Sequence, residues 1–415
     1  MKKILVIFIS LLVISCQKSK TKELTELVYL ETITSPGRTR IIQSIIDKYL
    51  DQNPDVRLEL ISPPYEQADN KLTLMLNSNQ PLDIIEVRDH TLKQFVNNGK
   101  LKDLSPYLSK WEHEKSLLEL TNMAARTIDN TPYLLPQFFF VKAMFVRSDV
   151  LSRLGYNEVP TTLEDMYRIS TEITDPEANQ YGFGFRGKGS SFKISDSMIL
   201  SDVPNIDPDN VYRTTDGQSV FTLPETKEAL QAYVELYRNA VPADGINWGF
   251  NEQVNAFISG TVPFLIQDPD TVALVNEQLG QDSYTVVPLP VGKSGKSYLD
   301  YGFAGLGIPS YTEKADAAWD FISYISSPEQ NADFAQAYGP LPVHRITHVD
   351  YFSSGVYKAW EETMSDSPDH VFVKYPIDSP KYPGWAQVQE QYMQSLLLGD
   401  ISVDEALSKW AEYWQ

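Results

Sequence analysis

The stretch LVYLETITSPGRTRIIQSIIDKYLDQNPDVRLEL, at residues 27–60, decides the fold class because it alternates between the patterns of a strand and of a helix. Leu27–Leu30 is a short apolar segment typical of a strand, and a loop with turn-forming residues follows it. Apolar side chains then recur at helical spacing from Ile41 to Leu50, and this pattern stops at Asn53-Pro54. Residues 56–60 alternate apolar and polar side chains, as a half-buried strand does. The stretch therefore predicts a strand–helix–strand unit.

The same alternation continues beyond this unit. A helix pattern at residues 72–76 precedes a strand pattern at 81–87, another helix pattern begins at Leu92, and the alternation resumes after Pro136. Strands and helices that alternate at this spacing indicate a parallel α/β sheet. The chain has 415 residues, which is more than one compact core normally holds. We therefore predict an α/β protein with two lobes.

Composition excludes several classes of protein. The hydrophobic share of 42% and the charged share of 22% are those of an ordinary globular chain. A net charge of −20 disfavours nucleic acid as a partner, because an acidic surface repels phosphate groups. A single cysteine excludes internal disulfides and cysteine-rich metal sites. The many aromatic residues (Trp 7, Tyr 23, Phe 18) suit the faces of sugar rings, but they also fill cores, so composition does not choose between the two.

The N-terminus carries the features of an export signal. Lys2 and Lys3 precede an apolar run at residues 4–14 that is too short to span a bilayer but has the length of a signal-peptide core. The run ends in Val-Ile-Ser-Cys16, which resembles the lipobox of bacterial lipoprotein precursors. The resemblance implies cleavage before Cys16 and acylation of its sulfur. We expect residues 1–15 to be the signal peptide and 16–26 a tether; a plain secretory signal with an accidental cysteine, or an uncleaved one, is the alternative.

Motifs that would indicate an enzyme are incomplete. The sequence GFGFRG at residues 182–187 matches the glycine pattern of a dinucleotide site, but neither a strand nor a helix flanks it as that site requires. His344 and His348 lie at helical spacing without a third metal ligand in view. Asp268 and Asp270 flank a proline, where a turn explains them better than a hydrolytic pair. We therefore predict no enzyme activity, no cofactor and no metal.

Several segments, in their order along the chain, together resemble the extracellular solute-binding proteins of bacterial ABC sugar importers, of the family 1, maltose-binding-protein-like type. Each segment is mostly a fold signature, and their order behind a lipobox carries the resemblance. They are residues 45–56, 80–85, 98–104, 256–263, 287–290, 302–308, 317–322, 339–343 and 398–407.

The resemblance implies a type II periplasmic-binding-protein fold, in which two α/β lobes with parallel-rich sheets flanked by helices close on a ligand about a hinge. We expect lobe one to hold residues 27–136 and 268–326, and lobe two residues 137–267 and 327–415. The chain would cross near 135–138, 266–270 and 327–338. It also implies a monomer that is lipid-anchored at the cell membrane, faces the periplasm or cell exterior, and delivers a carbohydrate, expected to be an oligosaccharide, to an ABC permease.

Candidate ligand groups lie on the loops after the predicted strands, where the crevice of an α/β sheet forms. They combine aromatic rings with carboxylates, amides and guanidinium groups, which suits stacking on a sugar and hydrogen bonding to its hydroxyls. They are Ser35, Arg38, Tyr65, Glu66, Asp89, Gln137, Phe138, Arg186, Trp248, Asp268, Asp270, Tyr338, Arg345 and Trp385, with Thr34 beside the first of them. We expect Trp248 and Trp385 to stack on the ligand, because both lie in loop-like sequence.

Three alternatives stay open at this point. The chain could be a surface-anchored glycoside hydrolase, which would need two carboxyl groups about 5–10 Å apart across a cleft. It could also be a binding protein of the same fold for a non-sugar solute, such as a phosphorylated polyol, a polyamine or a metal complex. A receptor domain used for signalling or adhesion would look the same in sequence.

Overall fold

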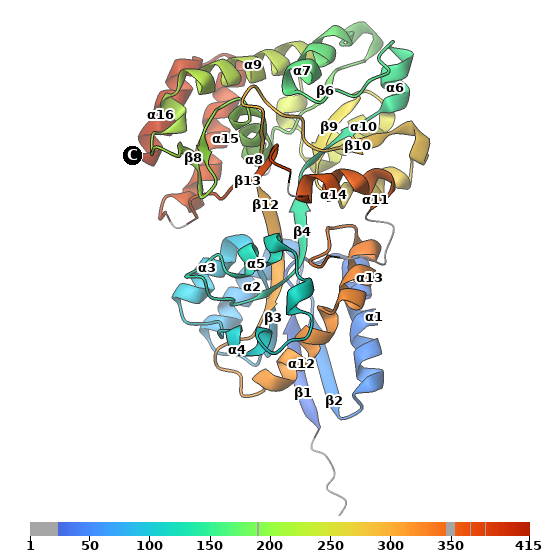
Figure 1. Ribbon diagram of the computed structural model, residues 1–415, viewed down its shortest axis with the longest axis vertical. Coiled ribbons are helices and arrows are strands. Elements are labelled where there is room, and N and C mark those ends of the chain that lie inside the picture. The colour runs from blue at the N-terminus through green and yellow to red at the C-terminus, as the bar shows by residue number, and fades with distance from the viewer. Residues whose placement is uncertain (1–23, 189–190, 346–352, 366, 378) are drawn as a thin grey trace, which may run out of the picture.

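The computed structural model describes residues 24–188, 191–345, 353–365, 367–377 and 379–415, which form two lobes, one above the other in Figure 1. Lobe one holds a five-stranded sheet in the order β2-β1-β3-β12-β4, and lobe two a four-stranded sheet in the order β10-β5-β9-β6. The chain has the two-lobe α/β fold that the sequence predicts. In the described part of the chain, no helix is both long enough and apolar enough to span a bilayer.

Lobe one begins with the predicted strand–helix–strand unit. β1 pairs in parallel with β2 and with β3, and β12 runs antiparallel between β3 and β4. The strands are β1 (Thr25–Leu30), β2 (Val56–Ile61), β3 (Ile84–Arg88), β4 (Leu135–Val141) and β12 (Tyr301–Gly307). The helices are α1 (Pro36–Gln52), α2 (Tyr65–Asn77), α3 (Asp89–Asn97), α4 (Ser105–Leu108), α5 (Glu119–Ala125), α12 (Ala315–Ile325) and α13 (Pro328–Tyr338), with the 3-10 turn η1 (Glu114–Ser116).

Helix α1 forms where the sequence predicts it, and its N-terminal cap and buried face explain its position. The Ser35 hydroxyl caps its N-terminus by accepting from the Arg38 N–H, and Pro36 occupies its first turn, where no N–H is needed. Ile42, Ile46 and Tyr49 are buried on one face against the sheet and α12. The helix thereby fixes the loop between β1 and α1, which points toward lobe two.

Lobe two is built mostly from antiparallel strands and long helices. Only the pair β6 and β9 is parallel in its four-stranded sheet. Its strands are β5 (Ala143–Val146), β6 (Phe183–Gly184), β9 (Phe264–Gln267) and β10 (Thr285–Val287), with the small pairs β7 (Ile206–Asp207) and β8 (Asn210–Thr214), and β11 (Ser297–Leu299) and β13 (His370–Phe372). Its helices are α6 (Ser148–Arg153), α7 (Leu163–Glu172), α8 (Ser191–Leu200), α9 (Pro224–Ala240), α10 (Phe250–Ser259), α11 (Thr271–Asn276), α14 (Lys358–Met364), α15 (Tyr382–Leu398) and α16 (Val403–Trp414). The remaining 3-10 turns are η2 (Pro176–Ala178), η3 (Val220–Thr222), η4 (Gly245–Asn247), η5 (Gln281–Ser283) and η6 (Gly355–Tyr357).

The chain crosses between the lobes at places that correct the expected boundaries. The first crossing is Lys142, between β4 in the first sheet and β5 in the second. The expected crossing at 266–270 is wrong, because β10 pairs with β5; the chain returns to lobe one only at Asp300, before β12. The expected crossing at 327–338 is also wrong, because α13 packs on α1 in lobe one (Figure 1). The segment up to Arg345 belongs to lobe one, and η6 and α14, which follow in the described part of the chain, pack on β10 in lobe two.

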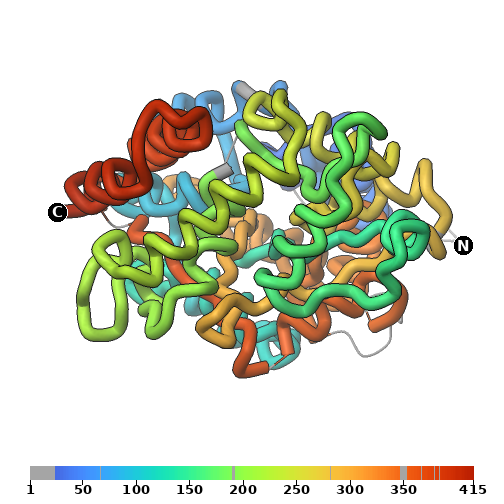
Figure 2. The backbone as a smooth tube through the Cα atoms, turned by 90° about the horizontal axis from the view of Figure 1, so that it is seen from above, coloured from blue at the N-terminus to red at the C-terminus, as the bar shows by residue number. Residues whose placement is uncertain are grey.

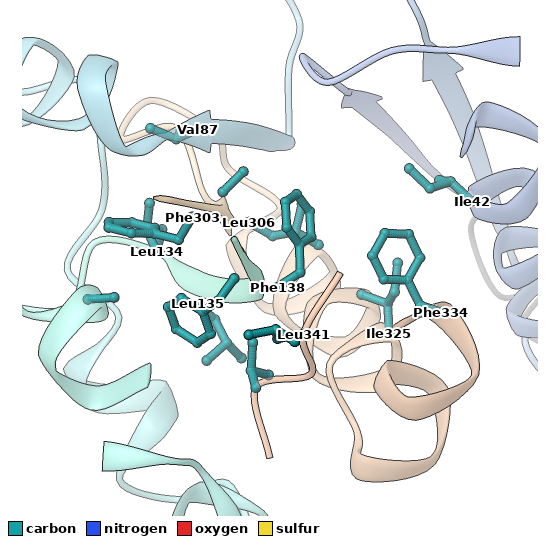
Figure 3. Packing of buried hydrophobic residues seen from close by; sticks show 14 of the residues in the cluster. Ile42, Val87, Leu134, Leu135, Phe138, Phe303, Leu306, Ile325, Phe334 and Leu341 are labelled. Carbon is teal, nitrogen blue, oxygen red and sulfur yellow. The ribbon is translucent and has the colours of Figure 1, made fainter. Parts of the chain in front are cut away.

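Each lobe has its own aromatic-rich core. Figure 3 shows part of the lobe-one core, where Phe138 of β4 and Phe334 of α13 lie with Leu306 and Leu341. In lobe two, Trp385 of α15 is fully buried, and its ring lies 5.2 Å from the rings of Tyr212 and Trp414. Helices α15 and α16 form the red C-terminal end of this lobe in Figure 2. The expected stacking role of Trp385 is therefore wrong, because its ring is core.

A substitution separates these two roles for Trp385. We expect Trp385→Ala to lower the free energy of unfolding by about 3–5 kcal/mol, because it leaves a cavity among close-packed rings. Urea denaturation measures this change. Leu398→Ala on the same helix is the control, since the Leu398 side chain is 63% exposed and its loss should change stability little. Equal stability of the two variants would contradict the assignment of Trp385 to the core.

Candidate functional site

Two adjoining cavities of about 320 and 360 Å³ lie between the lobes and form one cleft. Both are lined by residues of the two lobes, near the ends of β1, β6 and β9, where the crevice of an α/β sheet forms, and the first also by residues of the two crossings and of the end of β3. Residues common to both cavities are Ile33, Tyr65, Phe140, Arg186, Gln267 and Asp268. The first cavity adds Arg88, Asp89, His90, Lys142, Lys193, Ile194, Asp300, Gly302 and Phe303, and the second adds Thr34, Ser35, Phe250, Asp270 and Tyr338.

The lobe-one wall is shaped by the loop after β1, which a buried carboxylate holds in place. Glu86 on β3 accepts hydrogen bonds from the backbone N–H groups of Thr32 and Ile33, both at 2.8 Å. Arg38 forms ion pairs with Glu86 and with Glu31 and neutralises this buried charge. The wall around Ile33 is therefore fixed from behind by charge-assisted hydrogen bonds.

Tyr65, at the start of α2, is the most exposed ring of the lobe-one wall. Its side chain is 50% exposed, and the Arg88 guanidinium covers one ring face at 4.5 Å. Arg88 also forms an ion pair with Asp69 at 3.3 Å. The imidazole of His90 donates to the carboxylates of Asp69 and Asp89, and these hydrogen bonds raise the pKa of His90 to about 9, so it is charged at neutral pH.

The floor of the cleft is an ion cluster at the two crossings. The Asp300 carboxylate binds the Lys142 ammonium at 2.7 Å and the Lys193 ammonium of α8 at 3.1 Å. Burial alone raises the pKa of Asp300, but the two lysine charges outweigh it and lower the pKa to about 2. Burial likewise opposes the charge of Lys193, yet Asp300 and Asp89 raise its pKa above the ordinary value. The floor therefore stays ionised across the physiological pH range.

The lobe-two wall carries a guanidinium and two carboxylates. Arg186 follows β6, and Asp268 and Asp270 follow β9. Burial raises the pKa of Asp268, and burial followed by the charge of Asp268 raises the pKa of Asp270 to about 7. Buried amides hold this wall: Gln267 donates to Gln253 at 2.9 Å and accepts from the Asp268 N–H at 3.1 Å.

The structure brings half of the expected ligand residues together in this cleft. Those that line it are Ser35, Tyr65, Asp89, Arg186, Asp268, Asp270 and Tyr338, along with Thr34. Glu66 lies on α2, but its side chain is outside the described part of the structure, as is Cys16. Each of these residues lies close to the end of a strand or at a helix terminus; their contact with a ligand stays a prediction.

Other expected residues do not line the cleft, and each has a different role. Arg38 is 2% exposed and supports the lobe-one wall from behind. Phe138 is fully buried, with its ring 5.9 Å from that of Phe334. The Gln137 side chain is 4% exposed and donates to the Ser326 hydroxyl at 2.6 Å. Trp248 is not among the residues that line the two cavities, and its indole N–H donates to Asp244 at 3.1 Å; its stacking on the ligand stays a prediction.

Arg345 also lies outside the cleft. Its side chain is exposed, and its backbone N–H donates to Ser116 at 2.9 Å in lobe one. The side chain of the neighbouring His344 is buried and contacts the Ser326 carbonyl at 2.6 Å, so it belongs to the interior of that lobe. The segment around Arg345 therefore contributes to lobe one and not to the cleft walls.

The cationic residues of the floor escaped sequence reasoning. Lys142 and Asp300 are single residues between two strands, and no local pattern marks a crossing. Lys193 lies on α8 in sequence that reads as an ordinary helix. Phe140 and Phe303 lie in apolar segments that the sequence marks as strands. In such a segment, the sequence does not distinguish a side chain that faces the core from one that faces the cleft. Among the described residues, no group of acidic, histidine or cysteine side chains is suited to hold a metal.

A larger hollow, of about 680 Å³, lies elsewhere, on the outer side of lobe one between α4 and α12. Its aromatic wall is formed by Tyr107, Trp111 and Trp319, and the Tyr107 hydroxyl is already bonded to Asp316 at 2.8 Å. All its lining comes from lobe one. The interlobe cleft is the better candidate site because both lobes and both described crossings contribute charged groups to it.

Titration of Asp270 gives a test of the geometry of the lobe-two wall. Its raised pKa means that it contributes stability that is present at low pH and is lost as the pH rises from about 4 to about 7. We expect the free energy of unfolding of Asp270→Asn to fall less with pH over this window, by up to about 1.4 kcal/mol per pH unit. Denaturant unfolding of the ligand-free protein at several pH values measures both slopes. Parallel slopes in the two proteins would contradict a raised pKa.

Comparison with known proteins relates this arrangement to a family. The model of the bacterial extracellular solute-binding protein family matches residues 35–332. A maltotriose-binding protein from Pyrococcus abyssi is 23% identical over 315 residues, which are 74% of this chain and 64% of the relative. A mannitol-binding protein from Pseudomonas aeruginosa is 25% identical over 226 residues, 53% of this chain and 49% of the relative. The maltose-bound MalE3 structure from T. maritima superposes with a TM-score of 0.78 at 19% identity, covering 94% of this chain and 98% of the other.

Proposed function

This chain belongs to the bacterial extracellular solute-binding protein family, and we propose that it is the lipid-anchored receptor of an ABC importer that captures a carbohydrate between its lobes and delivers it to the permease. The family and its relatives support an extracellular binding role. The single observation that carries the proposal is the interlobe cleft, in which both lobes present hydrogen-bonding groups to one space.

The geometry supports capture by closure. A ligand in the cleft contacts both lobes, through Tyr65 and Asp89 on lobe one and through Arg186 and Asp268 on lobe two. It therefore stabilises the arrangement in which these groups face each other. A hydroxyl-rich ligand suits such walls, because each hydroxyl both donates and accepts. The permease then distinguishes loaded from empty receptor by the relative position of the lobes. Binding and release are sufficient for this role, and no bond of the ligand needs to change.

We test the ligand class by titrating the purified protein with maltose, maltotriose, D-mannitol and D-glucose in a calorimeter. Tyr65→Ala should weaken binding of the tightest of these by about 1 kcal/mol, roughly fivefold, because a stacking face is lost. The control is Leu74→Ala on the same helix, whose side chain is 68% exposed outside the cleft. If reducing ends are released from the oligosaccharides, the glycoside hydrolase alternative replaces the receptor.

Anchoring through Cys16 is part of the same proposal. Acyl chains on this cysteine, after cleavage of residues 1–15, would tether the protein to the membrane surface. We expect Cys16→Ser to move the protein from the detergent phase to the aqueous phase in Triton X-114 partitioning of expressing bacteria, and to remove labelling by an azido fatty acid. Unchanged partitioning of Cys16→Ser would show that the cysteine carries no anchor.

A further inference from the structure

Two charged side chains of the lobe-two wall, Arg186 and Asp268, line the cleft and have hydrogen-bonding atoms without partners among the described residues. Arg186 donates through Nε to the Lys188 carbonyl at 3.1 Å, and its terminal NH₂ groups have no hydrogen-bond partner among the described residues. The Oδ1 atom of Asp268 is buried and likewise lacks a partner within the described part of the chain. Buried polar atoms without partners are costly unless a ligand satisfies them. The buried Oδ1 atom of Asp268 is therefore a candidate for bonding a ligand, and the partly exposed Arg186 guanidinium, whose charge acts on the same carboxylate, is a second.

Charges of both signs surround these atoms. The cationic groups that line the cleft are Arg88, His90, Lys142, Arg186 and Lys193. The carboxyl groups that line it are Asp89, Asp268, Asp270 and Asp300, of which Asp270 is only partly ionised at neutral pH because its pKa is raised to about 7. The cleft therefore lacks the strongly acidic character that the net charge of −20 gives the whole chain. An ion that enters it meets groups of its own sign as well as groups of the opposite sign.

A charged ligand would meet a like charge at every position near Asp268. An ammonium group that approaches Asp268 also approaches Arg186, Lys142 and Lys193, whose charges all act on that carboxylate. A ligand carboxylate that approaches Arg186 instead meets Asp268 and Asp270. Loss of ion hydration in a confined site is costly unless a pair compensates for it, and each pair here is opposed by a neighbouring charge. A hydroxyl avoids the conflict because it donates to a carboxylate and accepts from a guanidinium.

The aromatic lining limits how many sugar rings the cleft can stack. Tyr65, Phe140, Phe250, Phe303 and Tyr338 line it, and no tryptophan does. One face of Tyr65 is covered by Arg88. A long oligosaccharide gains affinity from successive stacking platforms, and this cleft offers few flat, open faces.

We propose that Arg186 and Asp268 select a short, uncharged, hydroxyl-rich ligand, a mono- or disaccharide or an alditol, by bonding neighbouring hydroxyls between them. This inference rests on the carbohydrate-receptor function proposed above and adds its specificity. The proposed ligand is smaller than the oligosaccharide that the sequence led us to expect. The opposite charges of Arg186 and Asp268 disfavour charged sugars.

The first test uses the unmodified protein and matched sugars. Calorimetry compares D-glucose with D-glucosamine and D-glucuronate, and D-galactose with D-galactosamine and D-galacturonate, with D-mannitol, maltose and maltotetraose alongside. Neutral members should bind at least about tenfold more tightly than their charged counterparts, since an uncompensated charge in a confined site costs that much or more. Maltotetraose should bind no more tightly than maltose.

The second test changes the charge of the cleft in both directions by replacing each charged side chain with an uncharged polar one. Asp268→Asn leaves the cleft one unit more positive, and should narrow or reverse the preference for the neutral sugar over its uronate. Arg186→Gln leaves it one unit more negative, and should do the same for the amino sugar. Each variant should weaken binding of the neutral sugar by about 10- to 100-fold. Arg345→Gln is the control, because its exposed side chain lies outside the cleft, and thermal unfolding verifies that each variant is folded.

The outcomes separate the two proposals. Binding of a charged sugar as tight as that of its neutral parent, or of maltotetraose more tightly than maltose, overturns the selectivity while the receptor function stands. Unchanged preferences in folded Asp268→Asn and Arg186→Gln overturn the roles of these two residues. Binding of none of these sugars to the unmodified protein contradicts the carbohydrate-receptor function itself.

Discussion

The Asp300 carboxylate, held between Lys142 and Lys193, is the interaction on which the arrangement of the two lobes depends. Lys142 and Asp300 each form one of the two described crossings between the sheets, and their 2.7 Å ion pair joins these two crossings. Lys193 adds a helix of lobe two to the same carboxylate. Because a buried ion pair is stable only with its partners in place, this cluster fixes where the lobes meet and therefore where the floor of the cleft lies.

The cleft walls follow the same principle of buried charge with a nearby partner. Glu86 and Arg38 hold the loop after β1 from within lobe one, and the amides of Gln253 and Gln267 hold the loop after β9 within lobe two. Rigid support behind each wall leaves ligand bonding to side chains that project from it. A receptor built this way keeps each wall intact while the angle between the walls changes.

The sequence allowed the fold and part of the site to be predicted, for reasons visible in particular residues. The period of the apolar residues around Ile42 and Leu58 identifies helix and strand, and the ends of strands point to Asp89 and Asp268. Local sequence does not reveal sheet pairing, so β10 was assigned to the wrong lobe. Local sequence also does not distinguish a ring in the core from a ring in a cleft, because Trp385 and Tyr65 both lie in the first turn of a helix, shortly after a proline.

The direction of β1 places the N-terminal end of the described chain far from the cleft. In a parallel unit the carboxyl ends of the strands face the crevice, so the opposite end, at Thr25, lies at the pole of lobe one remote from lobe two (Figure 1). A chain held by its N-terminus is therefore held at that pole. With the proposed anchor at Cys16, lobe one would stand nearer the membrane and lobe two farther from it, so that closure on a ligand would move the lobe remote from the point of attachment.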